Sequence, residues 1–382
     1  MANVSSSNGL EKRPKLRFPG FDEPWEICTA EELFQNVTDK NHPDETVLTI
    51  VQGKGTLPRE QAGRNIHYDD ASLSNYKMVQ KGDFIIHLRS FEGGLEMANE
   101  NGIVSPAYTI LRGKKPHSSR FYEAYFHTDE FVNHVLSKSV EGIRDGRQIS
   151  YDAFKWLGLP YCSPSEQAKI AELFSVLTKR IEKQTVLVDS LKKYKRGAIA
   201  HILSGKDSEF AGEAIWAEKT LSDLCCEFRS GRSISATLIH ESGDYPVYGG
   251  NGIRGYCDHY SHEGEYVVVG RQGALCGNVR LIRGQNYLSE HAIAVRANEE
   301  NDTKFLLYLL DFMNLGQYSD QGAQPGLAVN KLLRLKCNVP EKKIQSKISA
   351  FLLTYDKQIA FQESILSLLT AQRKAFLQQL FI

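Results

Sequence analysis

The sequence has no long apolar run. The longest stretch of consecutive apolar residues spans only residues 305–310, whereas a membrane-spanning helix needs ~18 to 20. The first residues are rich in Ser and Asn and contain no apolar segment, so we expect no secretory signal. Hydrophobic residues nevertheless make up 41% of the chain, which is enough for a buried core. We therefore expect a globular cytoplasmic protein that makes no contact with a membrane.

Pairs of closely spaced cysteines are also missing. None of the seven cysteines stands in a C-x-x-C pair, which argues against a structural zinc site of the usual spacing and against a disulfide scaffold. The densest group of possible metal ligands is Cys257, His259 and His262, which lacks a fourth ligand. We interpret this group as part of a polar loop and predict no bound metal; a metal site is the less favoured alternative.

The chain carries no excess charge of either sign, with 46 basic and 46 acidic residues. The balance is uneven along the chain, because basic residues outnumber acidic ones in residues 164–203 and 340–382, while acidic residues outnumber basic ones elsewhere. Net charge therefore points to no particular partner.

Motifs of the common enzyme classes are absent as well. There is no G-x-x-x-x-G-K-[ST] phosphate loop and no G-x-G-x-x-G that opens a helix, and no metalloprotease or serine-nucleophile constellation stands out. Neighbouring acids such as Asp69 and Asp70 are more typical of a solvated loop than of a catalytic pair. We predict that the chain is not an enzyme and holds no cofactor of its own.

The sequence does contain an internal repeat, with an offset of 178 residues. Identical residues recur at this offset in residues 167–191 and 345–369, among them Gln167 and Gln345, Lys169 and Lys347, and Ile170 and Ile348. Apolar residues in both copies alternate at spacings of four and three, which is the heptad pattern of a coiled coil. Each copy follows a proline, as many helices do. We predict two helices of ~40 residues, each about 60 Å long, that pack against each other.

Two polar interruptions fall at equivalent steps of the two heptad patterns. Gln184 and Gln362 lie near the middle, and Lys195 and Arg373 lie further along. The apolar positions of a heptad pattern form a seam along which two helices pack. A buried polar residue in this seam lowers stability but can fix the register of the two helices. If the helices are antiparallel, Gln184 and Gln362 either meet at mid-helix or extend to the surface, and the sequence leaves both readings open.

The segments ahead of the helices are duplicated more loosely. Residues 82–89 and 264–271 predict strands that end on an arginine. Residues 120–137 and 304–315 predict helices. Two further segments, 25–37 and 216–228, each open with a tryptophan and predict a short helix.

These elements predict an α+β fold with a pseudo-two-fold internal repeat, in which two globular domains are separated by two long antiparallel coiled-coil helices. The predicted regions are residues 1–150 for the first globular domain, 151–205 for a central helical spacer, 206–325 for the second globular domain and 326–382 for a C-terminal helical spacer. The helical repeats resemble each other while the globular domains diverge, which favours a constant frame that carries two domains with different ligands.

These features together resemble the specificity subunits of type I restriction–modification enzymes. The resemblance covers nearly the whole chain, from about Leu16 to Ile382. It rests on five local signatures, which are residues 18–21 (Phe-Pro-Gly-Phe) followed by Trp25, residues 270–273 (Gly-Arg-Gln-Gly), residues 324–327 (Gln-Pro-Gly-Leu), and the helix starts at 165–170 and 343–348. The first half departs from the pattern, because Leu88-Arg89-Ser90 stands where Gly-Arg-x-Gly is expected.

The resemblance implies a function and a set of partners. Each globular domain would be a target recognition domain that reads one half of a bipartite, asymmetric sequence in double-stranded DNA. The chain itself would be non-catalytic and would dock two methyltransferase (modification) subunits, which bind S-adenosylmethionine. The assembly would recruit restriction subunits, which use ATP.

Candidate DNA contacts follow from the loops beside the predicted strands. Arg271 and Gln272 come first, because Arg pairs with guanine and Gln with adenine in the major groove. The remaining candidates are Asn251, Arg254, Tyr248 and Ser289 in the second domain and Arg89, Ser90 and Arg64 in the first. For each arginine, a surface ion pair or a phosphate contact is an equally favoured reading.

Two other protein classes compete with this interpretation. A non-catalytic coiled-coil scaffold with two binding modules and no DNA target also explains the repeat. A self-contained nuclease–methyltransferase should carry an Asn-Pro-Pro-aromatic or Asp-Pro-Pro-aromatic motif, and the sequence contains neither.

Overall fold

The computed structural model describes residues 14–62, 70–142, 147–205, 215–273, 275–320 and 326–381. The chain forms two compact units, each of which takes part of both long helices. Unit 1 comprises Met1–Thr185 and Ile365–Ile382, and unit 2 comprises Val186–Ser364. The predicted division into four regions assigns the helices to spacers of their own, whereas the compact units divide within the helices. Arg64 lies outside the described residues.

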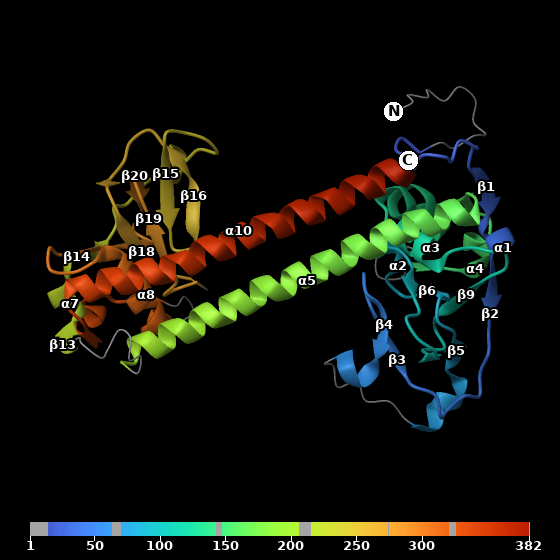
Figure 1. The fold of residues 1–382 in the computed structure, drawn as a ribbon, viewed down its shortest axis with the longest axis horizontal. Coiled ribbons are helices and arrows are strands. Elements are labelled where there is room, and N and C mark those ends of the chain that lie inside the picture. The colour runs from blue at the N-terminus through green and yellow to red at the C-terminus, as the bar shows by residue number, and fades with distance from the viewer. Residues whose placement is uncertain are drawn as a thin grey trace. The chain divides into compact units, whose positions relative to one another are not determined.

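The two heptad segments form continuous helices of 40 residues, α5 (Pro164–Leu203) and α10 (Lys342–Phe381), drawn green and red in Figure 1. The residues of the heptad pattern, spaced by four and three from Ile170 to Ile202 in α5 and from Ile348 to Leu380 in α10, are all buried or half-buried. In unit 1, Phe174 near the start of α5 shares a core with Leu380 at the end of α10. In unit 2, Ile202 near the end of α5 shares a core with Ile348 near the start of α10. The helices are therefore antiparallel, as predicted.

The polar interruptions of the seam have different surroundings. Gln184 and Gln362 are both half-buried, and since they belong to different units, their contact stays a prediction. Lys195 lies within unit 2, where its ammonium pairs with the carboxylate of Asp356 on α10 and lies 5.3 Å from the ring centre of Tyr308. The hydroxyl of Tyr308 donates to the same carboxylate at 2.6 Å. A lysine is tolerated at this position of the apolar pattern because Asp356 neutralises its charge.

Unit 1 contains a four-stranded antiparallel sheet in the order β2-β9-β6-β7, with smaller two-stranded pairs beside it. Its elements ahead of α5 are β1 (Glu26–Thr29), α1 (Ala30–Leu33), β2 (Phe34–Val37), β3 (Leu48–Val51), β4 (Gly55–Pro58), η1 (Arg59–Ala62), η2 (Asp70–Asn75), β5 (Lys77–Val79), β6 (Phe84–Ile86), α2 (Ser90–Gly93), β7 (Glu96–Met97), β8 (Gly102–Val104), β9 (Thr109–Gly113), α3 (Ser119–Phe126), η3 (Glu130–Val135), η4 (Leu136–Ser139), β10 (Val140–Glu141), β11 (Gln148–Ile149), α4 (Tyr151–Phe154) and β12 (Gly158–Tyr161).

Unit 2 contains two four-stranded sheets, in the orders β14-β21-β18-β19 and β16-β15-β20-β17. Its elements between the long helices are β13 (Ala217–Thr220), α7 (Leu221–Leu224), β14 (Cys225–Ser230), η6 (Ala236–Leu238), β15 (Tyr245–Gly249), β16 (Gly252–Cys257), β17 (His262–Glu263), β18 (Tyr266–Gly270), β19 (Val279–Ile282), β20 (Gln285–Leu288), β21 (Ala292–Ala297), α8 (Thr303–Phe312), η7 (Leu315–Tyr318), α9 (Val329–Leu332) and β22 (Lys336–Val339).

Strand β18 is buried on both faces, as its run of apolar residues predicts. Val267 and Val269 pack in the core that includes α8, whereas Tyr266 and Val268 pack with Leu288 of the second sheet. This alternation is the period-2 pattern of a strand. β18 therefore joins the two layers of unit 2 and fixes the position of the loop that follows it.

The prediction of short helices at residues 25–37 and 216–228 is largely wrong. Each segment forms two strands joined by one helical turn: β1, α1 and β2 in unit 1, and β13, α7 and β14 in unit 2. Thr29 with Glu32, and Thr220 with Asp223, make reciprocal capping bonds that stop the strand and start the turn. The strand on each side has a partner distant in sequence, for example β12 for β1 and β22 for β13. The spacing of apolar residues within each segment cannot predict which distant strand pairs with it.

The predicted helix at residues 120–137 is also interrupted. α3 ends at Phe126, and a π-helical turn follows from Glu130. The hydroxyl of buried Thr128 donates to the carbonyl of Tyr125 at 2.7 Å and accepts from the N–H of Phe131 at 3.1 Å. This side chain satisfies backbone groups that a continuous helix would pair, and it therefore breaks the helix.

A repeated glutamine ties each long helix to the globular part of its unit. Gln167 donates to the carbonyl of Cys162 at 2.8 Å and accepts from the N–H of Ser118 at 2.9 Å. Gln345 does the same with Pro340 and Asp302, both at 2.9 Å. Ser118 and Asp302 are the N-cap residues of α3 and α8. Gln167 and Gln345 are thus identical at the repeat offset because both make the same contact with the start of a helix in the globular part.

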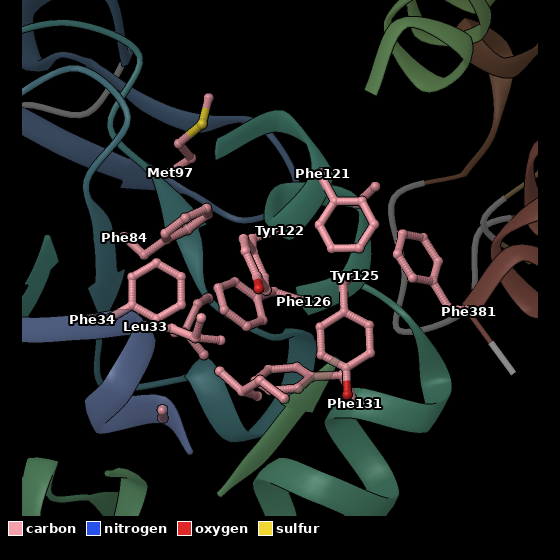
Figure 2. Close-up of a cluster of buried hydrophobic side chains, with 14 of the residues drawn as sticks. Leu33, Phe34, Phe84, Met97, Phe121, Tyr122, Tyr125, Phe126, Phe131 and Phe381 are labelled. Atoms are coloured by element: carbon pink, nitrogen blue, oxygen red, sulfur yellow. The ribbon is translucent and has the colours of Figure 1, made fainter. Parts of the chain in front are cut away.

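The end of α10 contributes an aromatic side chain to the core of unit 1. Figure 2 shows Phe381 directed toward Phe121 and Tyr125, with ring centres 5.2 and 5.5 Å away. Phe381 also stacks on Phe174 of α5, and all four side chains are at least 96% buried. The C-terminal end of α10 therefore completes a core formed mainly by residues of the first half of the sequence.

Candidate nucleic-acid interface

Three segments of unit 2 come together at the ends of their strands, and we call them the loop cluster: residues 248–252, 270–273 and 289–292. The N–H of Ser289 donates to the carbonyl of Tyr248, and the N–H of Arg271 donates to the carbonyl of His291, both at 2.9 Å. A Cβ atom on Gly250 would lie only 2.8 Å from the carbonyl oxygen of Gln272. Only glycine permits this approach of two backbones. The cluster therefore gathers five of the six second-domain candidates: Arg271, Gln272, Tyr248, Asn251 and the buried Ser289.

Arg271 and Gln272 follow β18 directly, and both are half-buried. The guanidinium of Arg271 donates to the carbonyl of Glu290 at 3.3 Å. The side-chain oxygen of Gln272 lies 2.7 Å from Nδ1 of His291. These contacts hold the two side chains on the loop cluster and reduce the conformational entropy that they would lose on binding. His291 was not among the predicted residues, and its role depends on a contact across 19 positions of sequence.

The other second-domain candidates occupy the β15–β16 hairpin and its neighbours. Residues 249–252 form the turn of this hairpin, in which Gly249 pairs with Gly252. Asn251 and Arg254 are exposed, and Arg254 folds over Gly249, where a Cβ atom would lie 2.5 Å from its Cδ. Ser289 is completely buried, and its hydroxyl has no hydrogen-bond partner among the described residues. Ser289 therefore shapes the cluster from inside.

A hollow of about 180 Å³ opens beside the loop cluster. Glycine backbone at residues 249, 250, 252 and 270 lines it, together with the side chains of Asn251, Asn278 and Arg280. Arg280, on β19, is exposed and reaches the hairpin, where its Nη1 lies 3.0 Å from the position of a Cβ on Gly252. Amide donors and acceptors beside an arginine are groups that hydrogen-bond base edges. Arg280 was not among the predicted contacts, because it lies inside a strand and not in a loop.

In unit 1, the candidates lie in the turn after β6. Arg89 is exposed, whereas Ser90 is completely buried and its hydroxyl accepts from the N–H of His87 at 2.9 Å. This bond holds the turn, so Ser90 presents no hydroxyl at the surface. A hollow of about 550 Å³ next to Arg89 is lined by residues 49–52, His87, Leu88 and Tyr108. Burial lowers the pKa of His87, so its ring is the neutral form at pH 7.

The possible metal ligands at residues 257–262 have other partners. The thiol of Cys257 donates to the carbonyl of His259, His259 pairs with Asp258 at 2.6 Å, and His262 lies 3.3 Å from Glu227. Within the described ranges, no three His, Cys, Asp or Glu side chains form a group that would hold a metal ion. In the same part of the chain, none of the helices carries a stretch long and apolar enough to cross a bilayer.

The chain is similar to known proteins over both units. A family model described as "Type I restriction modification DNA specificity domain" matches residues 214–371. The type I restriction enzyme EcoprrI specificity subunit of Escherichia coli is 38% identical over 223 residues, which are 54% of this chain and 54% of that protein. A putative type I specificity subunit of Mycoplasma pneumoniae, whose name marks it as an N-terminus, is 32% identical over 136 residues, or 34% of this chain and 73% of that protein.

The fold agrees with these sequence matches. The crystal structure of the type I restriction–modification system S subunit from M. genitalium superimposes with a TM-score of 0.67 at 18% identity, over 97% of this chain and 99% of that one. The match to the E. coli protein spans about half the length of that relative. Three findings agree on the family: the M. pneumoniae match covers 73% of that protein, the family model matches residues 214–371, and the fold is shared. This chain belongs to the family of type I restriction–modification specificity subunits.

Proposed function

We propose that this chain reads a bipartite, asymmetric sequence in double-stranded DNA, with one half read by each globular domain. The observation that carries the proposal is the combination of two units built on equivalent helix ends, tied by Gln167 and Gln345, with dissimilar loops. Equivalent frames suit two identical partners, whereas dissimilar loops suit two different half-sites. The chain performs no chemistry in this proposal and binds no cofactor.

In unit 2, the loop cluster and the neighbouring Arg280 supply the groups that contact DNA. Arg271 and Arg280 offer guanidinium donors suited to guanine, and Gln272 and Asn251 offer amides suited to adenine. Each good contact of this kind contributes about 1 to 3 kcal/mol of discrimination against a wrong base. In unit 1, Arg89 and the hollow beside it are the corresponding surface. The role of Arg64 stays a prediction from the sequence alone.

The partners follow from the family. Two methyltransferase subunits, carrying S-adenosylmethionine, dock on the two equivalent frames, and restriction subunits that use ATP join the assembly. Because both globular segments carry a slight acidic excess in sequence, phosphate neutralisation by the methyltransferase subunits supplies much of the affinity for DNA.

Methylation mapping tests this function directly. The chain is co-expressed with its cognate methyltransferase, and methylated positions are read across the host genome by long-read sequencing. We expect a split motif that requires this chain, and Arg271→Ala should relax one position of one half-site. Arg283→Ala is the matched control, because Arg283 is exposed and its pair with Glu265 lies outside the loop cluster. Methylation that is absent, or independent of this chain, would contradict the function; an unchanged motif in the Arg271→Ala variant would contradict that contact alone.

A further inference from the structure

The two cations that interrupt the seam differ in their partners. Lys195 and Arg373 stand 178 positions apart, at equivalent steps of the repeat. In unit 2, the carboxylate of Asp356 neutralises Lys195, and Tyr308 donates to the same carboxylate. The position equivalent to Asp356 in the first copy is Thr178, which carries no charge. The acid that completes the contact in unit 2 is therefore missing in unit 1.

Among the residues that the structure describes, no acidic side chain pairs with Arg373 as Asp356 pairs with Lys195. The side chain is half-buried, and it forms no hydrogen bond or ion pair with any residue in the described part of the chain. Its Nε is fully shielded from solvent. Leaving such a donor unsatisfied destabilises the fold, and more so when the group is charged. An anion in contact with this guanidinium would offset the cost of holding its charge half-buried.

A hollow of about 290 Å³ lies beside Arg373 in unit 1. α5 provides one wall through Phe174, Thr178, Lys179 and other residues, and α3 provides another. The turn at Gly53 and Arg373 itself complete the lining. The space is large enough for an ion of several heavy atoms together with water, since one water occupies about 30 Å³ of liquid volume.

The other charged groups of this hollow are partly paired already. Arg120 forms an ion pair with Glu123 at 2.7 Å. His127 lies 3.2 Å from the completely buried carboxylate of Glu96, which also accepts from the N–H of Gly53 at 2.7 Å. Arg373 and Lys179 remain as cations, and Glu182 is the remaining acid. The lining thus offers two unpaired cations against one carboxylate.

We propose that this hollow binds a small oxyanion, a phosphate or a carboxylate, through the guanidinium of Arg373 with Lys179 beside it. Guanidinium groups bind both oxyanions through paired N–H donors. The backbone of DNA suits the hollow less well, because Glu182 at the lining would repel the phosphates that follow at close spacing along the strand. The site is independent of base reading and lies in unit 1, outside the loop cluster.

Thermal stability of the full-length chain with added anion tests the proposal. In a buffer of a zwitterionic amine, inorganic phosphate and acetate are titrated separately at constant ionic strength. We expect the melting temperature of the wild-type protein to rise with the logarithm of the concentration of at least one anion, as it does for saturable binding to the folded state. Arg373→Gln should remove this response. If it persists in Arg373→Gln, or if neither anion produces it in the wild-type protein, the proposal is wrong.

Thr178→Asp provides a second, independent variant. It places a carboxylate where Asp356 stands in the other copy, and we expect it to neutralise Arg373, raise the melting temperature without ligand and abolish the response to phosphate and acetate. Lys193→Gln, at an exposed position of α5 in unit 2, is the control and should respond as the wild-type protein does.

A further titration uses duplex DNA and the complex with the methyltransferase. If Thr178→Asp weakens that binding while neither small anion binds, the hollow takes a DNA phosphate and the proposal is overturned.

Discussion

At the scale of single residues, the buried glutamine at the start of α10 makes a strong prediction. Gln345 is 1% exposed, and its amide bonds to Asp302, Asn301 and Pro340. Gln345→Ala removes these bonds and leaves the N–H of Asp302 and the carbonyl of Pro340 without that partner. We expect the free energy of unfolding to fall by about 2 kcal/mol or more, since each buried group left unsatisfied costs about 1 to 3 kcal/mol. Urea denaturation monitored by circular dichroism measures the change.

The control for Gln345→Ala lies on the same helix. Gln358 is exposed, so Gln358→Ala should change stability by less than about 0.5 kcal/mol. Equal effects of the two substitutions would mean that the contact between α10 and the N-cap of α8 contributes nothing beyond helix propensity.

The pair formed by His127 and Glu96 predicts a pH dependence. Burial alone would lower the pKa of His127, but the hydrogen bond and charge of Glu96 outweigh it and raise that pKa above 6.5. Burial alone would raise the pKa of Glu96, but His127 and the N–H groups of Gly53 and Gly55 outweigh it and lower that pKa below 4.5. The pair therefore contributes fully between about pH 4.5 and 6.5. Its contribution falls as pH rises through the raised pKa of His127, and as pH falls through the lowered pKa of Glu96.

Comparison with His127→Gln isolates this pair. His87 nearby has a pKa that burial lowers, so it destabilises the fold as pH drops below 6.5; this effect is present in both proteins and largely cancels. We expect the difference in unfolding free energy between wild type and His127→Gln to be largest near pH 6 and to shrink toward pH 9. A difference that is constant over this range would show that His127 carries no charge in the folded protein.

At the scale of elements, the end of α10 belongs to the core of unit 1. Phe381 is completely buried against Trp25, Phe121, Tyr125 and Phe174. Phe381→Ala should lower the free energy of unfolding by about 3 to 5 kcal/mol, because it removes a large buried ring and leaves a cavity. Phe361 on the same helix is 61% exposed, and Phe361→Ala is the matched control with an expected loss below about 1 kcal/mol. Thermal melts of the two variants give the comparison, and similar melting temperatures would place Phe381 outside the cooperative core.

At the scale of the whole molecule, neither half of the sequence contains a complete unit. Unit 1 needs residues 365–382, and unit 2 needs residues 186–203 of α5. Fragments 1–205 and 215–382 should therefore be poorly soluble when expressed singly, because each exposes core residues such as Phe174 or Ile348. Co-expressed, they should co-purify in equal amounts and support the same methylation motif. A soluble, folded fragment 1–205 alone would contradict the division of the units.

The heptad spacing by itself determined the two long helices, their pairing and the pseudo-two-fold repeat, since an apolar stripe of that length is buried only against a similar one. The strand at residues 266–270 followed from its run of β-branched residues in the same local way. Tertiary structure alone decided the strands on either side of α1 and α7, because the strands that pair with them are distant in sequence, such as β12 for β1 and β21 for β14. It also decided the loop cluster: His291 joins Arg271 and Gln272, with Arg280 of β19 beside the cluster, only where separate strands meet. Within the described residues, Lys195 pairs with an acid and Arg373 does not, because different side chains of the opposite helix face them. The spacing of residues along one helix cannot predict this.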